Sequence, residues 1–311
     1  MSDHPKNSPY NAAYTIYCQT ALHAGSGAVL SHVDLPIQRE VHSGHPIVNA
    51  SGWKGALCEH CDKADFVESL FGSEPGRPGP STAGCGIFQE LRLLLFPVRS
   101  FKEVFVWATC PLILERAKLH LNGTGIKIPD WPLPQIGNNT AWFDDALAIK
   151  ENLCIEDYDF LLPSTATPES KALFAEFRKQ LAELFIPEAV YSAYWHNAVK
   201  SRTVVLSDDD FANIAALHTQ IETHVQINDD GTVGSGPWNQ ESLPPDSVLY
   251  TAIRIPAVLE GSNTTPAALG VALESMLDQK LLPVGGDRSL GKGWVKAAKL
   301  RQPAAANEVS K

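Results

Sequence analysis

The order in which strands and helices are predicted along the chain limits its fold more than any other feature. The segments predicted as strands are rich in β-branched, aromatic or other apolar residues: 14–21, 87–96, 101–110, 247–257 and 294–300. The segments predicted as helices have a capping residue, a first-turn proline or an apolar face: 51–64, 111–121, 168–185, a helix after Ser207, and 264–279. Strands and helices do not alternate regularly, so the order favours an antiparallel α+β sheet over a doubly wound parallel one.

The middle of the chain is less regular than its two ends. Residues 122–140 are rich in proline, glycine and asparagine and are expected to be surface loop. Residues 220–228, a turn at 229–232 and a short return through Trp238 predict a hairpin. Ser207 precedes three aspartates, an arrangement typical of a capped first helical turn, with a metal cluster as the less favoured alternative.

Composition limits the class of protein. The 311 residues are 44% hydrophobic and 19% charged, which is typical of a globular chain. Residues 1–13 are polar and no apolar run is long enough to cross a bilayer, so we expect a cytoplasmic protein with no membrane partner. The net charge of −10 argues against binding nucleic acid by bulk electrostatics. Residues 279–301 nevertheless contain six basic residues and one acidic residue, so a locally basic face remains open.

Two N-terminal segments carry residues suited to binding an anion. A glycine-rich turn at 22–27 is followed by Asp34, on a proline-braced loop, and by Arg39. Asp beside Pro is also a common turn device, so catalytic and structural roles for Asp34 are both open. At 49–57, Ser51, small residues and Lys54 form a helix start that suits a phosphate, although a plain capped helix fits the same pattern.

A third segment, residues 285–294, lies between the last predicted helix and strand. It combines four glycines with two cations: Gly285, Gly286, Gly291, Gly293, Arg288 and Lys292. Such a loop suits close approach to a polyanion backbone, with a purely structural loop as the alternative. It is not a phosphate-binding loop of the Walker type, because a strand follows it and no helix does.

The cysteines give a weak metal signal. Cys58 and Cys61 have the spacing of a zinc ligand pair, but a tetrahedral site would also need Cys85 and a distant histidine. Cysteine on a core-facing helix is usually a small hydrophobic residue. We therefore do not expect zinc.

In this order, the three segments resemble the RAMP superfamily of CRISPR RNA-binding proteins, and in particular the backbone subunit of the type III-B Cmr effector complex. The resemblance is dense over roughly 14–120 and 240–300 and thin between them. The matching segments are 22–27, 33–40, 42–47, 54–57, 70–74, 93–100, 243–246 and 285–294. Many short motifs in one order are far more specific than any single glycine loop.

The resemblance implies a fold and a set of partners. The fold is a single RAMP domain over 1–311: a ferredoxin-like (RRM-type) antiparallel palm at about 14–121 and 247–300, with a large insertion at about 122–246 that includes a thumb-like hairpin. The partners are a guide CRISPR RNA, a target RNA, further copies of the chain stacked as a filament, and other Cmr subunits. Base pairing to the guide would supply specificity, while the protein grips the guide backbone.

The resemblance also implies roles for single residues. Arg39, Ser51, Lys54 and the 285–293 loop would hold guide phosphates. Asp34 would bind Mg²⁺ or Mn²⁺ and cut the target RNA by attack of a ribose 2′-hydroxyl.

His23 and Glu241 would assist this cleavage. Trp53, which replaces a smaller residue usual in the family, would place an indole near the RNA path. Two alternatives stay open: a catalytically inert guide-binding scaffold, and a metal-independent guide-processing ribonuclease that uses His23.

Overall fold

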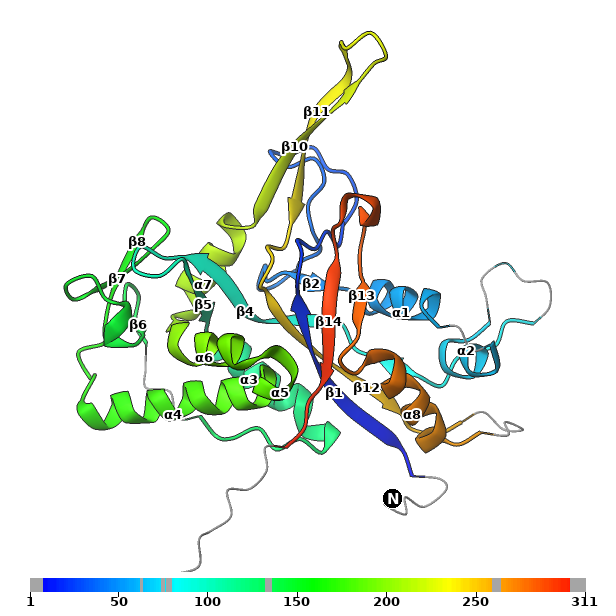
Figure 1. Ribbon diagram of the computed structural model, residues 1–311, viewed down its shortest axis with the longest axis horizontal. Coiled ribbons are helices and arrows are strands. Elements are labelled where there is room, and N and C mark those ends of the chain that lie inside the picture. Colours follow the sequence, from blue (N-terminus) through cyan, green and yellow to red (C-terminus); the bar gives the residue numbers. More distant parts are fainter. Residues whose placement is uncertain are drawn as a thin grey trace, which may run out of the picture.

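The computed structural model describes residues 8–61, 64–73, 76, 80–131, 136–258 and 264–302. Its strands are β1 Tyr10–Cys18, β2 Ile47–Val48, β3 Ile87–Phe88, β4 Leu91–Arg99, β5 Phe105–Thr109, β6 Ala141–Trp142, β7 Asn152–Ile155, β8 Tyr158–Leu161, β9 Thr203–Leu206, β10 Gln220–Ile227, β11 Val233–Ser242, β12 Val248–Ile255, β13 Leu281–Pro283 and β14 Trp294–Lys299. Its α-helices are α1 Ala50–Glu59, α2 Ala64–Phe71, α3 Pro111–Leu121, α4 Pro168–Phe185, α5 Glu188–Tyr191, α6 Ala193–Arg202, α7 Asp208–Leu217 and α8 Pro266–Leu277 (Figure 1).

One large sheet organises the described part of the chain. Its order is β13-β14-β1-β12-β4-β5-β9-β6, with β2 also paired to β4 and β3 to β12. In the central part, β14, β1, β12 and β4 pair antiparallel. The chain passes through α1 between β1 and β4, and through α8 between β12 and β14. The fold is therefore α+β with a mostly antiparallel sheet, as expected from the order of the predicted elements.

One pair of strands departs from the expected antiparallel pattern. β5 pairs with β9 in parallel. Parallel neighbours need a long crossover to bring the chain back to the same end of the sheet, and here α3, α4, α5 and α6 all lie between the two strands. The sequence prediction missed β9, because a four-residue apolar run is too short for periodicity to distinguish it from a buried helix segment.

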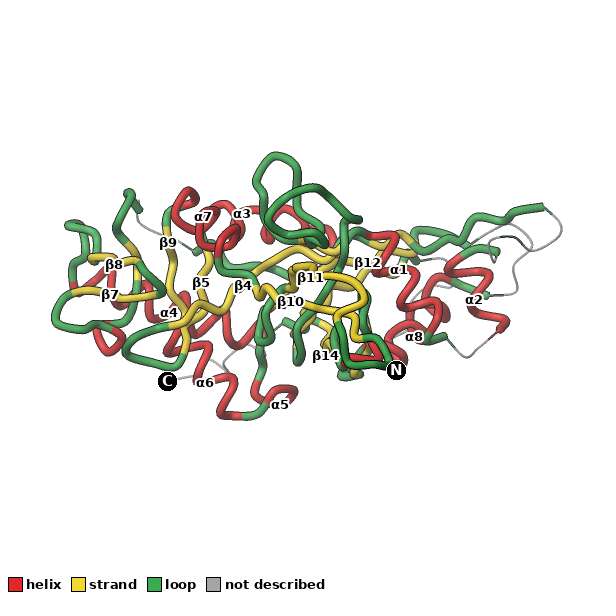
Figure 2. The backbone as a smooth tube through the Cα atoms, turned by 90° about the horizontal axis from the view of Figure 1, so that it is seen from above, coloured by secondary structure: helices red, strands yellow, loops and turns green. Residues whose placement is uncertain are grey.

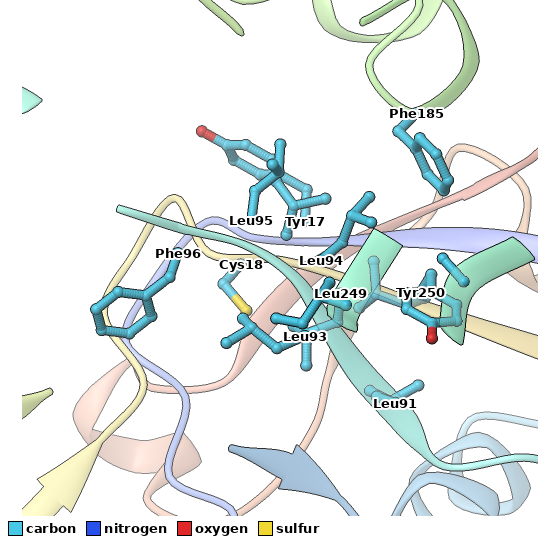
Figure 3. Packing of buried hydrophobic residues seen from close by; sticks show 14 of the residues in the cluster. Tyr17, Cys18, Leu91, Leu93, Leu94, Leu95, Phe96, Phe185, Leu249 and Tyr250 are labelled. Carbon is cyan, nitrogen blue, oxygen red and sulfur yellow. The ribbon is translucent and has the colours of Figure 1, made fainter. Parts of the chain in front are cut away.

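Helices cover both faces of the sheet (Figure 2). Strand β4 is accordingly buried along most of its length, including Leu91 and residues 93–96. In Figure 3, Tyr17 and Phe185 lie on one side of the central strands, and Leu91 and Leu93 lie on the other. A strand buried on both faces has a continuous apolar sequence instead of an alternating one, which explains the run at 93–96.

Several helix boundaries agree with the prediction. Pro111 begins α3, and α4 has a capping box between Thr167 and Ser170. The side chain of Ser207 accepts a hydrogen bond from the backbone N–H of Asp210, so the aspartate run is the first turn of α7. These boundaries depend on neighbouring residues only, which is why they can be read from the sequence.

The start of α1 differs from the prediction. Asn49, not Ser51, occupies the cap position, and the helix ends at Glu59 instead of near Ala64. The backbone N–H of Asn49 donates a hydrogen bond to the side chain of Gln38 at 2.7 Å, so a contact with the preceding loop fixes where the helix begins. The Trp53 side chain is fully buried, which corrects the expectation of an indole beside the RNA path.

The predicted hairpin is present and longer than expected. Strands β10 and β11 pair from Gln220 with Ser242 out to Ile227 with Val233. In Figure 1 this hairpin projects away from the body of the molecule, and the loops between β1 and β2 rise beside its base.

Candidate functional site

The loop between β1 and β2 is fastened to the base of the hairpin. Leu22 and Leu243 exchange backbone hydrogen bonds of 2.9 Å in both directions. Gly25 bridges to Ile37, and Leu35 bridges to Gln240. The strand that leaves the hairpin therefore holds the whole segment 22–37, which carries two of the predicted catalytic residues.

Asp34 lies where this loop meets β11. Its Oδ2 accepts a hydrogen bond from the backbone N–H of Asn239 at 2.7 Å, and its own N–H donates to the Asn239 carbonyl at 3.1 Å. The side chain is half-buried, and its Oδ1 accepts none of the hydrogen bonds found within the described part of the chain. One carboxylate oxygen thus orients the residue while the other remains free to bind.

His23 contacts the same strand at Glu241, two residues after Asn239. Its Nδ1 is 2.6 Å from the Glu241 carbonyl oxygen. Because a carbonyl only accepts, Nδ1 carries the proton and Nε2 is the unprotonated nitrogen of the neutral ring. The Nε2 atom lies beside Gly25, where a Cβ would come within 2.8 Å of it. A glycine at 25 therefore leaves room for this imidazole.

Glu241 is a buried junction between three segments. Its carboxylate accepts hydrogen bonds from Arg39 Nη2 at 2.5 Å, from Thr219 Oγ1 at 2.7 Å and from the Ile37 N–H at 2.9 Å. The residue is only 5% exposed. These contacts favour a positioning role for Glu241, because its carboxylate oxygens already serve the chain itself.

The guanidinium of Arg39 likewise has its hydrogen-bond partners within the chain. Besides Glu241, its guanidinium donates to the carbonyl oxygens of Gly44 and Ala215. The predicted phosphate contact from Arg39 would have to compete with these bonds, so its geometry favours holding the loop against α7.

A hollow of about 330 Å³ opens between α1 and the glycine-rich loop. It brings together residues from all three predicted segments: His23, Gly25, Ser51, Gly52, Gly285 and Arg288. A second hollow, of about 610 Å³, adjoins it along α1 and shares Ser51, Gly55 and Glu59. Lys54 lines the second hollow and forms no ion pair with another described residue. Together the two hollows form a groove along α1 that includes the exposed start of this helix.

The glycine-rich loop packs against His23 through its backbone. The Gly286 N–H donates to the His23 carbonyl at 2.9 Å. Gly285 has φ +82°, and a Cβ there would lie 2.4 Å from the same carbonyl oxygen. Gly293 has φ +78°, and a Cβ there would lie 2.0 Å from the Val284 carbonyl oxygen. Both positions require glycine for close backbone contact. Gly291 also has a positive φ, of +79°, but faces open space.

The two cations of this loop are paired inside the chain. Arg288 Nη1 lies 2.7 Å from Glu59 Oε1 of α1. Lys292 Nζ lies 2.8 Å from Glu222 Oε2 of the hairpin, and its side chain is 7% exposed. The hydrogen bond from Lys292 holds the pKa of the Glu222 carboxyl below its usual value. Lys292 therefore joins the loop to the hairpin.

Several cations of the wider basic segment 279–301 also have partners within the chain. Lys299 pairs with Glu274 at 2.7 Å, and Arg301 pairs with Asp278 at 2.5 Å. Lys296 donates to the Val190 carbonyl. A count of charges along the sequence could not show these partners, because they come from other elements.

Potential metal ligands do not cluster in the described ranges. They contain no group of three or more His, Cys, Asp or Glu side chains placed to hold one ion. No disulfide joins Cys58, Cys61 or Cys85 to another described residue. The sequence analysis did not single out Asn239, which orients Asp34, or Thr219, which helps to hold Glu241. The sequence signal that could have found such residues was the polar character of the second strand of the predicted hairpin.

The described helices include none with the length and apolar character needed to span a membrane.

The arrangement defines a groove-bearing α+β domain with a projecting hairpin, and comparison with known proteins agrees. The model of the RAMP superfamily matches residues 15–296, so the chain belongs to the RAMP superfamily.

The chain is also similar to individual proteins and solved structures. The chain is 29% identical over 288 residues to the CRISPR system Cmr endoribonuclease Cmr4 of Pyrococcus furiosus, covering 90% of this chain and 92% of that protein. The crystal structure of oligomeric Cmr4 from P. furiosus is similar with a TM-score of 0.70 and 23% identity, covering 93% of this chain and 97% of that one. A cryo-EM structure of the type III-B Cmr-beta complex bound to cognate target RNA contains a chain similar at a TM-score of 0.69 and 20% identity, covering 95% and 98%.

Proposed function

We propose that this chain is a guide-RNA-binding backbone subunit of a type III-B CRISPR effector complex and that it cleaves target RNA paired to the guide. One observation carries the proposal: three segments far apart in the sequence meet around a single groove beside the base of the projecting hairpin. The similarity to the endoribonuclease Cmr4 along nearly the whole chain supports it. The partners in this proposal are guide and target RNA, further copies of the chain and other Cmr subunits, in the cytoplasm.

The central sheet is, in this proposal, a ferredoxin-like palm. The chain passes β1, α1, β4, β12, α8 and β14 in order. The strands lie in the order β14-β1-β12-β4, so each helix connects two strands that are not neighbours. This order of two interleaved β-α-β units is the one that defines the ferredoxin-like arrangement, and the β10–β11 hairpin is its thumb.

The guide backbone would lie in the groove along α1. Ser51 and Lys54 are in the first turns of α1, where backbone N–H groups favour an anion. Gly285 and Gly286 bring the opposite wall close, and Arg288 supplies a guanidinium. Arg39, Lys292, Gly291 and Gly293 shape the loops in this proposal. Contacts of this kind hold the RNA without reading its sequence.

Asp34 is the proposed catalytic residue. Its free, half-exposed Oδ1 fits a single hydrated Mg²⁺ or Mn²⁺, because these ions are often held by one carboxylate and several waters. When bound, such an ion supplies charge neutralisation at the scissile phosphate. The Asn239 N–H fixes the carboxylate at the foot of the hairpin, where the target strand would pass in this proposal.

His23 would accept or orient a proton near the same strand. Its hydrogen bond to the Glu241 carbonyl leaves Nε2 as the basic nitrogen, which suits a general base for a ribose hydroxyl. Glu241, held by Arg39 and Thr219, positions this carbonyl and the loop that carries Asp34.

Substitution of Asp34 tests the proposal. In a complex assembled with guide RNA, Asp34→Asn retains an oxygen to accept from Asn239 but removes the charge. We expect target binding to remain and cleavage in Mg²⁺ to fall by at least about a hundredfold. Asp157→Ala, an exposed acid in the turn between β7 and β8, is the control and should cut normally.

Equal cleavage by the Asp34→Asn and native complexes would show that Asp34 is not catalytic. Absence of cleavage by the native complex, with binding retained, would identify the chain as an inert scaffold. Cleavage of guide precursor by the lone chain in EDTA would instead indicate a processing ribonuclease.

A further inference from the structure

An ion pair crosses the groove beside α1. Arg288, in the glycine-rich loop, and Glu59, the last residue of α1, lie on opposite walls, and their side chains meet at 2.7 Å. Both line the smaller hollow, and Glu59 also lines the larger one. The pair therefore stands at the border between the two hollows, in the path that a nucleotide chain along α1 would take.

This pair is weak enough to exchange partners. The side chain of Arg288 is 35% exposed and that of Glu59 is 60% exposed. Water screens ion pairs of this kind, so they contribute little to stability. A phosphate offers a guanidinium the same geometry of acceptors as a carboxylate does. The hydrogen bond from Arg288 lowers the pKa of Glu59, so the carboxylate is charged at neutral pH and competes fully with phosphate.

Lys54, on the same groove, differs from Arg288 in having no acidic partner within the described ranges. It pairs with no other described residue, so a phosphate reaches it without displacing a partner. The groove thus combines one cation that is open to RNA with one that is already engaged by the protein.

We propose that Glu59 competes with RNA for Arg288, so that each copy of the chain grips the RNA backbone weakly and firm retention requires several copies on one RNA. The inference rests on the proposed function, because it takes the groove to be the RNA path. Each copy that binds exchanges one carboxylate for one phosphate. The loss per copy is small, and the contributions of several copies on one RNA multiply. Glu59 is then the residue that makes the groove selective for long, multiply bound RNA.

The test measures binding of labelled poly(U) oligonucleotides of increasing length to the full chain. We expect Glu59→Gln to tighten binding of the shortest bound oligonucleotide by roughly two- to fivefold, the range for release of an exposed ion pair. The gain should grow with length as more copies bind. In an Arg288→Gln background, Glu59→Gln should have no effect, because the contested cation is gone.

Glu115→Gln is the matched control. It removes the same charge from a carboxylate that is as exposed as Glu59. Glu115 pairs with Lys118 on α3 and lines neither hollow. It should leave RNA affinity unchanged. Unaltered thermal midpoints for all variants would show that folding is not the cause.

Two results would overturn the inference. One is a Glu59→Gln affinity no higher than that of the native chain or no different from Glu115→Gln. The other is an equal gain when Arg288 is already replaced. Failure of the proposed function is distinct from both, because the native chain would then bind no poly(U) and Lys54→Gln would change nothing.

Discussion

The buried side chain of Lys292 forms an ion pair with Glu222 that ties the glycine-rich loop to the projecting hairpin. Their charged atoms are 2.8 Å apart, and Lys292 Nζ also lies 3.3 Å from Ser242 Oγ. Gln240 of the hairpin donates to Asp287 of the same loop. The hairpin is therefore fastened at its base on the loop side as well as on the Asp34 side.

Replacing one residue of this pair should lower the free energy of unfolding more than replacing both. Lys292→Met leaves Glu222 without its cation, and we expect the free energy of unfolding to fall by about 1–2 kcal/mol, less than for a fully buried pair. Lys292→Met with Glu222→Gln should recover most of this loss. Urea unfolding of the two single variants and the double variant measures the coupling.

The same cycle on the exposed pair Lys179 and Glu176 of α4 serves as the control and should give a coupling below about 0.5 kcal/mol. A coupling between Lys292 and Glu222 that is no larger than this would mean that the pair does not fasten the hairpin.

A second prediction concerns acid stability and Glu40. This carboxylate is buried and accepts from Arg92 at 2.9 Å, from Arg116 at 2.6 Å, and from Ser43. Burial raises its pKa, but the Ser43 hydrogen bond and the two guanidinium charges more than offset this, so the pKa lies below its usual value. A lowered pKa in the folded state adds stability above the unfolded-state pKa, and this stability is lost as pH falls through the folded-state pKa.

Glu40→Gln should therefore destabilise the chain by about 2–3 kcal/mol at neutral pH, because it leaves two partly buried guanidinium groups without their counter-charge. The difference from the native chain should begin to shrink below the unfolded-state pKa of glutamate, about 4.3, and should shrink further as pH falls through the lower pKa of the folded state. Urea unfolding from neutral to acid pH measures this, with Glu115→Gln as the control. A difference that stays constant across this range would contradict the assigned role of Glu40.

Local signals predicted local structure well. The first residue of α3, both ends of α4 and the cap of α7 follow from residues within one helical turn, so spacing and capping chemistry were sufficient. The hairpin was likewise predicted from a turn between two polar strands. The three segments that the resemblance singled out also meet in the structure, where His23, Ser51 and Gly285 line one hollow.

Long-range pairings could not be predicted in the same way. Arg288 and Lys292 look like free cations in the sequence, yet their partners, Glu59 and Glu222, lie on elements that only the fold brings close. The burial of Trp53 has the same origin, because it depends on which face of α1 meets the sheet. Chain spacing carries no information about such neighbours.

The last prediction separates the two reasons for glycine in the 285–293 loop. Gly285 and Gly291 have similar positive φ angles, of +82° and +79°. An added Cβ at 285 would lie 2.4 Å from the His23 carbonyl oxygen, whereas at 291 it would meet no atom within 4 Å. Gly291→Ala should therefore cost only the conformational term, about 1 kcal/mol.

Gly285→Ala should cost the same term plus the displacement of His23, for a total of about 3 kcal/mol. Because the Gly286 N–H also binds the His23 carbonyl, the shift would move the His23 imidazole into the groove. RNA affinity should therefore fall for Gly285→Ala but not for Gly291→Ala. Urea unfolding and poly(U) binding of the two variants measure both effects. Equal losses of stability would show that backbone conformation alone explains these glycines, because the close approach of the loop to His23 would then carry no cost.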